Sequence, residues 1–234
     1  MFSWPNIFTL LNLVCGCIAL FGIFYESSWV VIITFGLALI FDFLDGFSAR
    51  LLSQTSELGK QLDSLADLIS FGVFPTFLLI DIVERSVEIR EWPVYGLIFL
   101  LAAGAALRLA RFNTGKEGDS GFMGMPSPAM AMTVFAIWVN LDNTVYPSLE
   151  MLSDPVFILI LSLFLTFMMN ISLRFIKFSL GNSYTLDQIL SLLLILIFLG
   201  GLFVNWRLAV LITSLSYIIL SLLFPLFSRS ARSS

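Results

Sequence analysis

The sequence predicts an all-helical integral membrane protein with about eight transmembrane helices. Of its 234 residues, 59% are hydrophobic and only 12% are charged, and the mean hydropathy is +0.98. A soluble domain usually carries about 25% charged residues, because water must wet its surface. Apolar runs that approach the roughly 20 residues needed to cross a bilayer recur along the chain. This composition therefore fits a protein whose solvent is lipid.

The predicted helices follow one another with short connections. The first run is too long, and too poor in basic residues at its front, for a cleaved signal peptide, so we expect a retained helix. Prolines stand near the starts or ends of several runs, where proline is tolerated. The last two runs are nearly fused, with only Asn205, Trp206 and Arg207 on which the chain can turn. The predicted helices cover residues 6–25, 29–48, 59–83, 93–112, 127–147, 155–177, 187–205 and 206–227.

Basic residues predict the orientation of the chain. With eight crossings, one side of the membrane receives Arg50, Lys60, Arg108, Arg111, Lys116, Arg174, Lys177, Arg229 and Arg232, and the other receives Arg85, Arg90 and Arg207. Cytoplasmic loops carry an excess of lysine and arginine, so both termini are expected in the cytoplasm. The connection over residues 142–154 contains acids and no basic residue, and it is expected outside.

Missing residue types exclude several kinds of chemistry. The chain has no histidine, which excludes histidine nucleophiles, histidine bases and histidine metal ligands. No basic patch interleaved with aromatic residues indicates a nucleic-acid partner. Cys15 and Cys17 lie two residues apart in the first apolar run and point to different sides of a helix. They fit apolar packing better than a disulfide or a metal pair.

Four aspartates stand at the facing ends of the second and third predicted helices. Carboxylates at membrane depth are costly, so each one requires an explanation. Asp42 and Asp45 are three residues apart, and Asp63 and Asp67 are four apart. Each pair therefore lies on one face of its helix. The short connection makes the two helices antiparallel neighbours, so all four carboxylates are expected to converge.

Converged carboxylates require a cation, because like charges repel strongly in a low dielectric. Arg50 alone cannot balance four of them, and an all-oxygen set of ligands favours a hard divalent cation, Mg²⁺ or Mn²⁺. The alternative is a group of solvated acids at helix ends, paired with Arg50 and Lys60. Gly46 and Gly59 either let a substrate approach closely or ease the packing of helices.

The aspartates belong to a longer spaced pattern. It reads Asp42-x-x-Asp45-Gly46-x-x-Ala49-Arg50, then eight residues, then Gly59-x-x-x-Asp63-x-x-x-Asp67. At every defined position this pattern resembles the signature of the CDP-alcohol phosphotransferase family. The resemblance implies a metal site built from the four aspartates, with Asp67 as the general base. It also implies that the cytidine and pyrophosphate site is shaped by Gly46, Ala49, Arg50 and Gly59.

The same resemblance carries expectations about domain organisation. Members of that family typically have six core helices. We therefore expect one transmembrane domain over residues 1–234, with a catalytic core at 1–180 and an additional pair of C-terminal helices at 185–228. The resemblance alone implies a homodimer. The expected location is the cell membrane of a bacterium or an archaeon, with the active site on the cytoplasmic side.

Three further stretches resemble the phosphatidylserine synthase branch of the family. They are residues 5–9 leading to Asn12, residues 67–75, and residues 108–113 followed by residues 126–129. The resemblance implies transfer of a phosphatidyl group from CDP-diacylglycerol to L-serine, with phosphatidylserine and CMP as products. Asn6 and Thr9 either reach the nucleotide or cap the first helix.

Arg108 and Arg111 are candidates for binding the acceptor or a phosphate. They are three residues apart on a predicted helix, and two guanidinium groups can hold a carboxylate or a phosphate through paired hydrogen bonds. The alternative is positive-inside charge that reaches lipid headgroups. Asn113 and Ser127 are assigned to the same region. Lys116 joins them or is simply charge on a loop.

Two other functions stay open on the sequence alone. One is the same family chemistry with another acceptor, such as glycerol 3-phosphate, inositol phosphate or a choline-like alcohol. The other is a transporter or channel whose aspartates bind a cation, which predicts acids near the bilayer midplane and broken helices facing one another. Here the acids cluster at one side and no inverted repeat is visible, which favours the enzyme.

The orientation is testable by cysteine labelling in a background without Cys15 and Cys17. Glu150→Cys should react with a membrane-impermeant maleimide added to intact cells, because the connection over 142–154 is expected outside. Gln54→Cys, in the connection after Arg50, should react only once the membrane is permeabilised. The opposite pattern of labelling would show that the chain is inserted the other way round.

Overall fold

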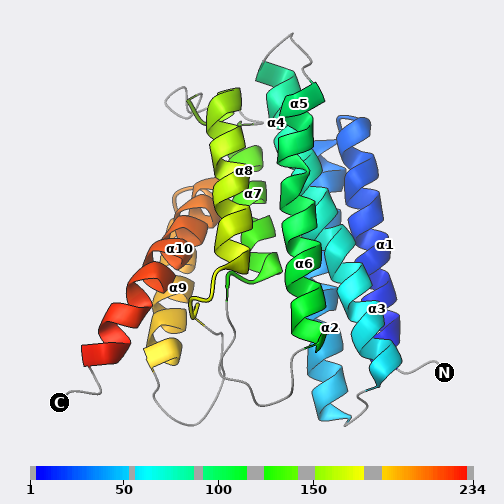
Figure 1. Cartoon of the computed structure of the whole chain (residues 1–234), viewed down its shortest axis with the longest axis vertical. Coiled ribbons are helices and arrows are strands. Elements are labelled where there is room, and N and C mark those ends of the chain that lie inside the picture. The colour runs from blue at the N-terminus through cyan, green and yellow to red at the C-terminus, as the bar shows by residue number, and fades with distance from the viewer. Residues whose placement is uncertain are drawn as a thin grey trace.

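The structure is a computed structural model that describes residues 4–52, 56–86, 92–114, 124–141, 151–176 and 186–230. Helices account for nearly all of these residues and form one bundle (Figure 1). In chain order they are α1 (Trp4–Phe24), α2 (Ser28–Leu51), α3 (Glu57–Leu68), the π-helical turn η1 (Ile69–Val73), α4 (Phe74–Ser86), α5 (Trp92–Ile98), α6 (Leu100–Thr114), α7 (Ser127–Leu141), α8 (Pro155–Asn170), α9 (Leu186–Leu202) and α10 (Trp206–Ser230).

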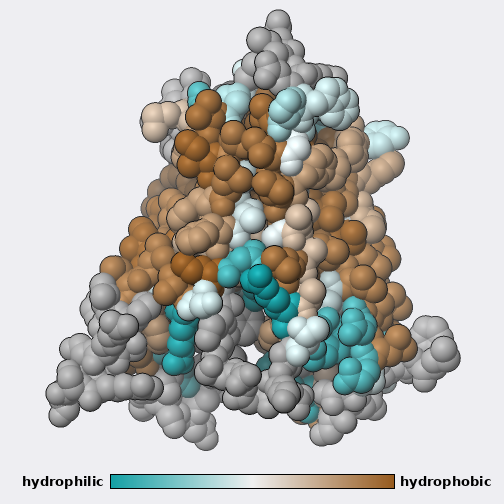
Figure 2. Space-filling view, in the orientation of Figure 1, coloured by the Kyte–Doolittle hydropathy of each residue, from teal (hydrophilic) through white to brown (hydrophobic). Residues whose placement is uncertain are grey.

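The predicted all-helical membrane architecture is confirmed for the described residues. The segments α3, η1 and α4 form one span over Glu57–Ser86, and α5 with α6 forms another over Trp92–Thr114. These two, with α1, α2 and α10, are long and apolar enough to cross a membrane, whereas α7, α8 and α9 are shorter apolar helices. Hydrophobic residues cover much of the flanks of the bundle (Figure 2), as expected of a surface that meets lipid.

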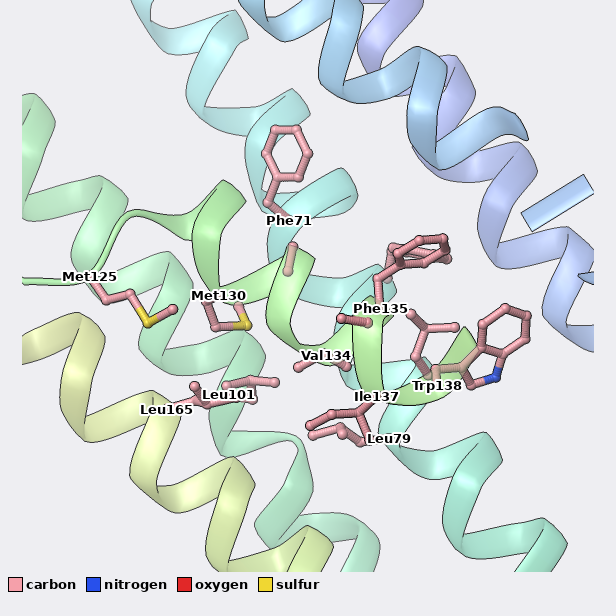
Figure 3. Close-up of a cluster of buried hydrophobic side chains, with 14 of the residues drawn as sticks. Phe71, Leu79, Leu101, Met125, Met130, Val134, Phe135, Ile137, Trp138 and Leu165 are labelled. Atoms are coloured by element: carbon pink, nitrogen blue, oxygen red, sulfur yellow. The ribbon is translucent and has the colours of Figure 1, made fainter. Parts of the chain in front are cut away.

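The core of the bundle is built around α7. Eleven of its fifteen residues are buried, so it packs on several faces at once. Met130, Val134 and Trp138 of α7 lie among buried apolar side chains of the neighbouring helices (Figure 3). Phe35 of α2 reaches the same cluster, where its ring lies 4.7 Å from the ring of Phe135. The predicted extension of this helix over residues 142–147 lies outside the described residues.

The predicted helix over residues 155–177 is too long, because α8 ends at Asn170. Backbone groups beyond a helix end need other partners, and here they find them in distant segments. The carbonyl of Leu173 accepts a hydrogen bond from the backbone N–H of Gly124 at 2.8 Å. The carbonyl of Ile176 accepts one from the hydroxyl of Tyr217 at 3.2 Å. Residues 171–176 therefore run as an irregular strap beneath α8.

The sequence predicted one uninterrupted helix over residues 59–83. The span Glu57–Ser86 instead contains the π turn η1. The Ser70 hydroxyl within this turn donates a hydrogen bond to the backbone carbonyl of Asn12 on α1 at 3.1 Å. A Cβ atom at Gly16 would collide with the same hydroxyl, so only glycine permits this approach. The close contact brings α1 against the end of α3, where Asp67 lies.

The two C-terminal helices are separate, as predicted, and α10 is tied to the core. The turn between them closes where the N–H of Asn205 bonds to the carbonyl of Gly201 at 3.0 Å. The Asn140 amide of α7 donates to the carbonyl of Arg207 at 2.9 Å, and the Arg207 guanidinium donates to the carbonyl of Val139 at 2.9 Å. The division into a core at 1–180 and an added pair at 185–228 stays a prediction.

Replacing Gly124 tests the strap beneath α8. Gly124 has a φ of +80°, and a Cβ atom there would collide with the carbonyl of Met169. Gly124→Ala should lower the free energy of unfolding by more than about 1 kcal/mol, measured by thermal unfolding in detergent. Gly36→Ala is the matched control, because a Cβ atom at this α2 position meets nothing within 4 Å. Equal melting temperatures for the two variants would contradict the assigned strap.

Candidate active site

Three aspartates from two helices meet at one point. Asp42, Asp63 and Asp67 each have a carboxylate oxygen that lies within 4.8 Å of those of the other two. Asp42 is on α2, and the other two are on α3. Helix α1 packs extensively on both α2 and α3, whereas direct packing between α2 and α3 is slight. The distance between the backbones of α2 and α3, across which the carboxylates converge, is therefore set by the packing of both helices on α1.

Asp45 stands beside this cluster, one turn further along α2. It is 6% exposed and lies close to the hydroxyl of Thr9 and to the charges of Asp42 and Asp63. Its Oδ2 atom is buried and has no hydrogen-bond partner among the described residues. A buried carboxylate oxygen is costly unless something pairs with it. The structure thus brings three of the expected ligands together and leaves the fourth as a neighbour with one oxygen to offer.

None of the four aspartates forms an ion pair with a basic side chain in the part of the chain that the structure describes. Neither of the ion pairs found there involves Asp42, Asp45, Asp63 or Asp67. The alternative pairing with Arg50 and Lys60 is not observed among these residues, since the Lys60 ammonium donates instead to the carbonyl of Asn113 at 3.3 Å.

An excess of closely spaced negative charge with oxygen ligands only is the environment that suits a hard divalent cation. The donor set Asp42, Asp63 and Asp67 therefore fits Mg²⁺ or Mn²⁺. The buried, unpaired oxygen of Asp45 provides a further acceptor at the edge of the same site.

An asparagine on α1 joins the cluster. The side-chain amide of Asn12 is fully buried, and its Nδ2 donates a hydrogen bond to Oδ1 of Asp67 at 3.4 Å. Sequence reasoning noted Asn12 only as part of a resemblance and gave it no contact with an aspartate. The position of Asn12 within an apolar run could have indicated such a contact, because a polar group at membrane depth needs a partner.

The residues expected at the nucleotide line the same end of the bundle. A Cβ atom at Gly59 would lie 3.1 Å from the Oδ1 of Asn6, so the two residues are in close contact. Asn6 and Thr9 lie inside α1, which begins before them at Trp4 in the described residues, and the Thr9 hydroxyl donates to the carbonyl of Pro5 at 3.0 Å. The alternative that they cap the first helix is therefore wrong.

The last turns of α2 present a more open surface. A Cβ atom at Gly46 would meet nothing within 4 Å, so this glycine does not serve close packing between helices in the described structure. Arg50 is exposed near the end of α2, and Ala49 beside it is half-buried. Space next to Gly46, close to Asp42 and Asp45 along the same helix, leaves room for a ligand.

The two arginines of α6 have different environments. Arg108 is 9% exposed, interacts electrostatically with Asp67, and its Nη1 donates a hydrogen bond to the Ser127 hydroxyl at 2.9 Å. Arg111 is exposed. The sequence placed both on one face of the helix; in the structure Arg108 is buried near Asp67, whereas Arg111 is exposed, and its role in binding the acceptor or a phosphate stays a prediction. Lys116 lies outside the described residues.

Asn113 connects the end of α6 to α3. Its Nδ2 donates a hydrogen bond to the hydroxyl of Ser64 at 2.8 Å, and its carbonyl accepts the one from Lys60. Ser64 directly follows Asp63 in the chain. In the structure Asn113 therefore positions the helix that carries two of the aspartates.

Comparisons with known proteins identify relatives of this chain. A family model described as CDP-alcohol phosphatidyltransferase matches residues 2–169. Three curated relatives, each described as a CDP-diacylglycerol–serine O-phosphatidyltransferase, are similar to the chain. The Bacillus subtilis protein is 33% identical over 55% of the chain and 71% of its own length. The Helicobacter pylori protein is 36% identical over 68% of the chain and 65% of its own length. The Methanocaldococcus jannaschii protein is 39% identical over 53% of the chain and 54% of its own length.

The convergence of carboxylates predicts a ranking of metal affinities. Asp42→Ala and Asp63→Ala should each raise the dissociation constant of Mn²⁺ by more than about tenfold. Removing a residue that only hydrogen-bonds to a metal ligand already lowers metal affinity about 10–100-fold, and removing the ligand itself should lower it further. Asp45→Ala should weaken binding less, since Asp45 lies beside the cluster. Binding is measured on purified protein by the electron paramagnetic resonance signal of free Mn²⁺.

Asp81 provides the matched control for these variants. It lies on the same span as Asp63, but its carboxylate accepts a hydrogen bond from the Trp138 indole at 2.6 Å and pairs with Arg85 at 2.9 Å. Asp81→Ala should therefore leave the affinity for Mn²⁺ unchanged. If it weakens binding as much as Asp42→Ala does, the losses report damage to the fold and not loss of a ligand.

Proposed function

The chain belongs to the CDP-alcohol phosphatidyltransferase family, and on that premise we propose that it transfers the phosphatidyl group of CDP-diacylglycerol to L-serine, releasing CMP. The observation that carries the choice of acceptor is the position of Arg108, a buried cation that interacts with Asp67 and hydrogen-bonds to Ser127. The names of the relatives support the same acceptor. The closeness of Arg108 to Asp67 suits an acceptor whose anionic group lies near its reacting hydroxyl.

In the proposed reaction Asp67 is the general base. It takes the proton of the serine hydroxyl, and the serine oxygen forms a bond to the phosphorus that carries the diacylglycerol. The bond from this phosphorus to the oxygen of CMP breaks at the same time. A divalent cation held by Asp42, Asp63 and Asp67 would offset the charge of the pyrophosphate and of the transition state. CMP leaves as a phosphate anion, so no separate general acid is needed.

Arg108 is proposed to bind the carboxylate of serine. A guanidinium group presents a planar fork of donors that matches a planar carboxylate, whereas an ammonium is a point charge. Because Arg108 is buried, it meets little competition from water. Asn113 and Ser127 have protein partners that fix α3 and Arg108, so we propose that they support the acceptor site through those contacts.

The donor is proposed to enter from the membrane with its nucleotide toward the ends of α1, α2 and α3. Gly46, Ala49, Arg50 and Gly59 would shape the cytidine and pyrophosphate region, with Asn6 and Thr9 beside it. Arg50 is the exposed cation at the end of α2 that is suited to the charge of departing CMP. The cytoplasmic placement of the site, the cell-membrane location and the homodimer stay predictions.

A panel of acceptors tests the proposed reaction. Purified protein with CDP-diacylglycerol and Mn²⁺ should release CMP fastest with L-serine. Ethanolamine has the reactive hydroxyl without the carboxylate and should therefore be a poor acceptor. Release of CMP with glycerol 3-phosphate or inositol phosphate at the rate seen with serine would reject serine as the specific acceptor. Failure of every alcohol to release CMP would reject the transfer reaction itself.

Arg108→Lys tests the proposed carboxylate contact. The charge is retained but the planar fork is lost, so the KM for serine should rise at least about tenfold, with a smaller change in the KM for CDP-diacylglycerol. Arg85→Lys is the matched control, because Arg85 pairs with Asp81 at 2.9 Å and has no assigned role at the site, and it should leave both constants near their original values. A rise confined to the KM for the donor would place the lipid phosphate, and not serine, at Arg108.

A further inference from the structure

Asn12 on α1 contacts both Asp67 and Ser70. Its buried Nδ2 donates to Oδ1 of Asp67 at 3.4 Å, and its backbone carbonyl accepts a hydrogen bond from Ser70 at 3.1 Å. We propose that Asn12 is a positioning residue that fixes the orientation of the Asp67 carboxylate for proton transfer and for binding the cation. This inference rests on the proposed function for its catalytic consequence.

A carboxylate in this cluster needs such a partner. The terminal torsion of an aspartate is broad, so the rotamer alone does not fix where its two oxygens point. Asp42 and Asp63 also repel the Asp67 carboxylate from nearby positions. A donor that holds one oxygen leaves the other directed to a separate task. Asn12 provides that donor on the side of α1.

A neutral amide suits this task better than a cation. Lysine or arginine at residue 12 would pair with Asp67 and offset the negative charge that attracts the divalent cation. An amide orients the carboxylate and leaves its charge in place. The amide is also short, so its donor stays close to the backbone of α1, where few rotamers are available to a fully buried side chain.

The position of Asn12 relative to Asp67 is fixed by the backbone. Ser70 follows Asp67 by three residues on the same span, and its hydroxyl bonds to the Asn12 carbonyl. The absence of a side chain at Gly16, one turn after Asn12, permits this approach. The π turn that contains Ser70 begins two residues after Asp67. The backbone and the side chain of Asn12 thus hold the same short segment.

The partner of its donor distinguishes Asn12 from other buried amides of the bundle. Asn140 and Asn170 donate to backbone carbonyls, and their Oδ1 atoms have no partner among the described residues. The Oδ1 of Asn12 likewise has none there, but its Nδ2 donates to the carboxylate of Asp67. The contact that sets Asn12 apart is therefore the one with Asp67.

The test is a double-mutant cycle between Asn12→Leu and Asp67→Asn. Leucine has a similar volume to asparagine but no donor. In the wild-type background Asn12→Leu should lower kcat about 10–100-fold and weaken Mn²⁺ binding within the same range, as for loss of partners that orient ligands. The KM values should change little. With Asp67→Asn already present, the second substitution should have less than about a twofold effect on either quantity, because no carboxylate remains to orient.

Cys15→Ala is the matched control, because Cys15 is buried on the same helix and makes none of the contacts described at the cluster. It should change the melting temperature as much as Asn12→Leu does while leaving kcat and Mn²⁺ affinity in place. Full additivity of Asn12→Leu with Asp67→Asn, or an unchanged Mn²⁺ affinity in Asn12→Leu, would overturn the positioning role. If the wild type releases no CMP with any alcohol, the proposed function fails, whereas the Mn²⁺ cycle still decides the role of Asn12.

Discussion

The gathering of carboxyl groups at one end of an apolar bundle is the constraint on which the rest of the site depends. Asp42, Asp63 and Asp67 offer oxygen atoms that lie within 4.8 Å of one another inside an apolar bundle. At such distances like charges cost far more than they would in water. The surrounding helices hold the acids together against this force, and a divalent cation bound by them would offset it. The Asn12 amide donates a hydrogen bond to Asp67, and the Arg108 cation interacts with the same carboxylate, so both residues act on this excess of negative charge.

The bundle provides that restraint through close approaches between helices. Gly16 lets α1 reach Ser70, which fixes α1 against the span that carries Asp67. Asn113 bonds to Ser64 and so fixes the end of α6 against the same span. The buried aromatic cluster of Phe35, Phe135 and their neighbours anchors α2 and α7 from the apolar side. A rigid apolar core thus positions a polar site that would otherwise spread apart, which is how membrane proteins keep ionisable groups at depth.

Sequence reasoning recovered those features that depend on helical periodicity. Hydropathy located the spans, and the spacing of Asp63 and Asp67 placed both on one side of α3 because four residues complete about one turn. Residues three apart differ by about 60° around a helix axis, which is enough to bury Arg108 and expose Arg111. That distinction depends on where the neighbouring helices lie, which periodicity does not contain.

The sequence pattern did not predict features that depend on contacts with residues distant in the chain. Helix α8 ends at Asn170, and the carbonyls of the residues that follow accept hydrogen bonds from the Gly124 N–H and the Tyr217 hydroxyl, both far away in the sequence. The π turn and the contact between Asn12 and Asp67 depend on how closely α1 approaches its neighbour. Each is a tertiary effect that overrides a local pattern. The polar residue in an apolar run was the visible sign that such a partner existed.

We propose that these aspartates hold a divalent cation at the place where the two substrates react. Anomalous diffraction from crystals grown with Mn²⁺ and a CDP-linked lipid tests it most directly. We expect a peak bonded directly to carboxylate oxygens of Asp42, Asp63 and Asp67 and in contact with the pyrophosphate of the lipid. A bound lipid with no peak at these residues, or with the peak at other side chains, would contradict it.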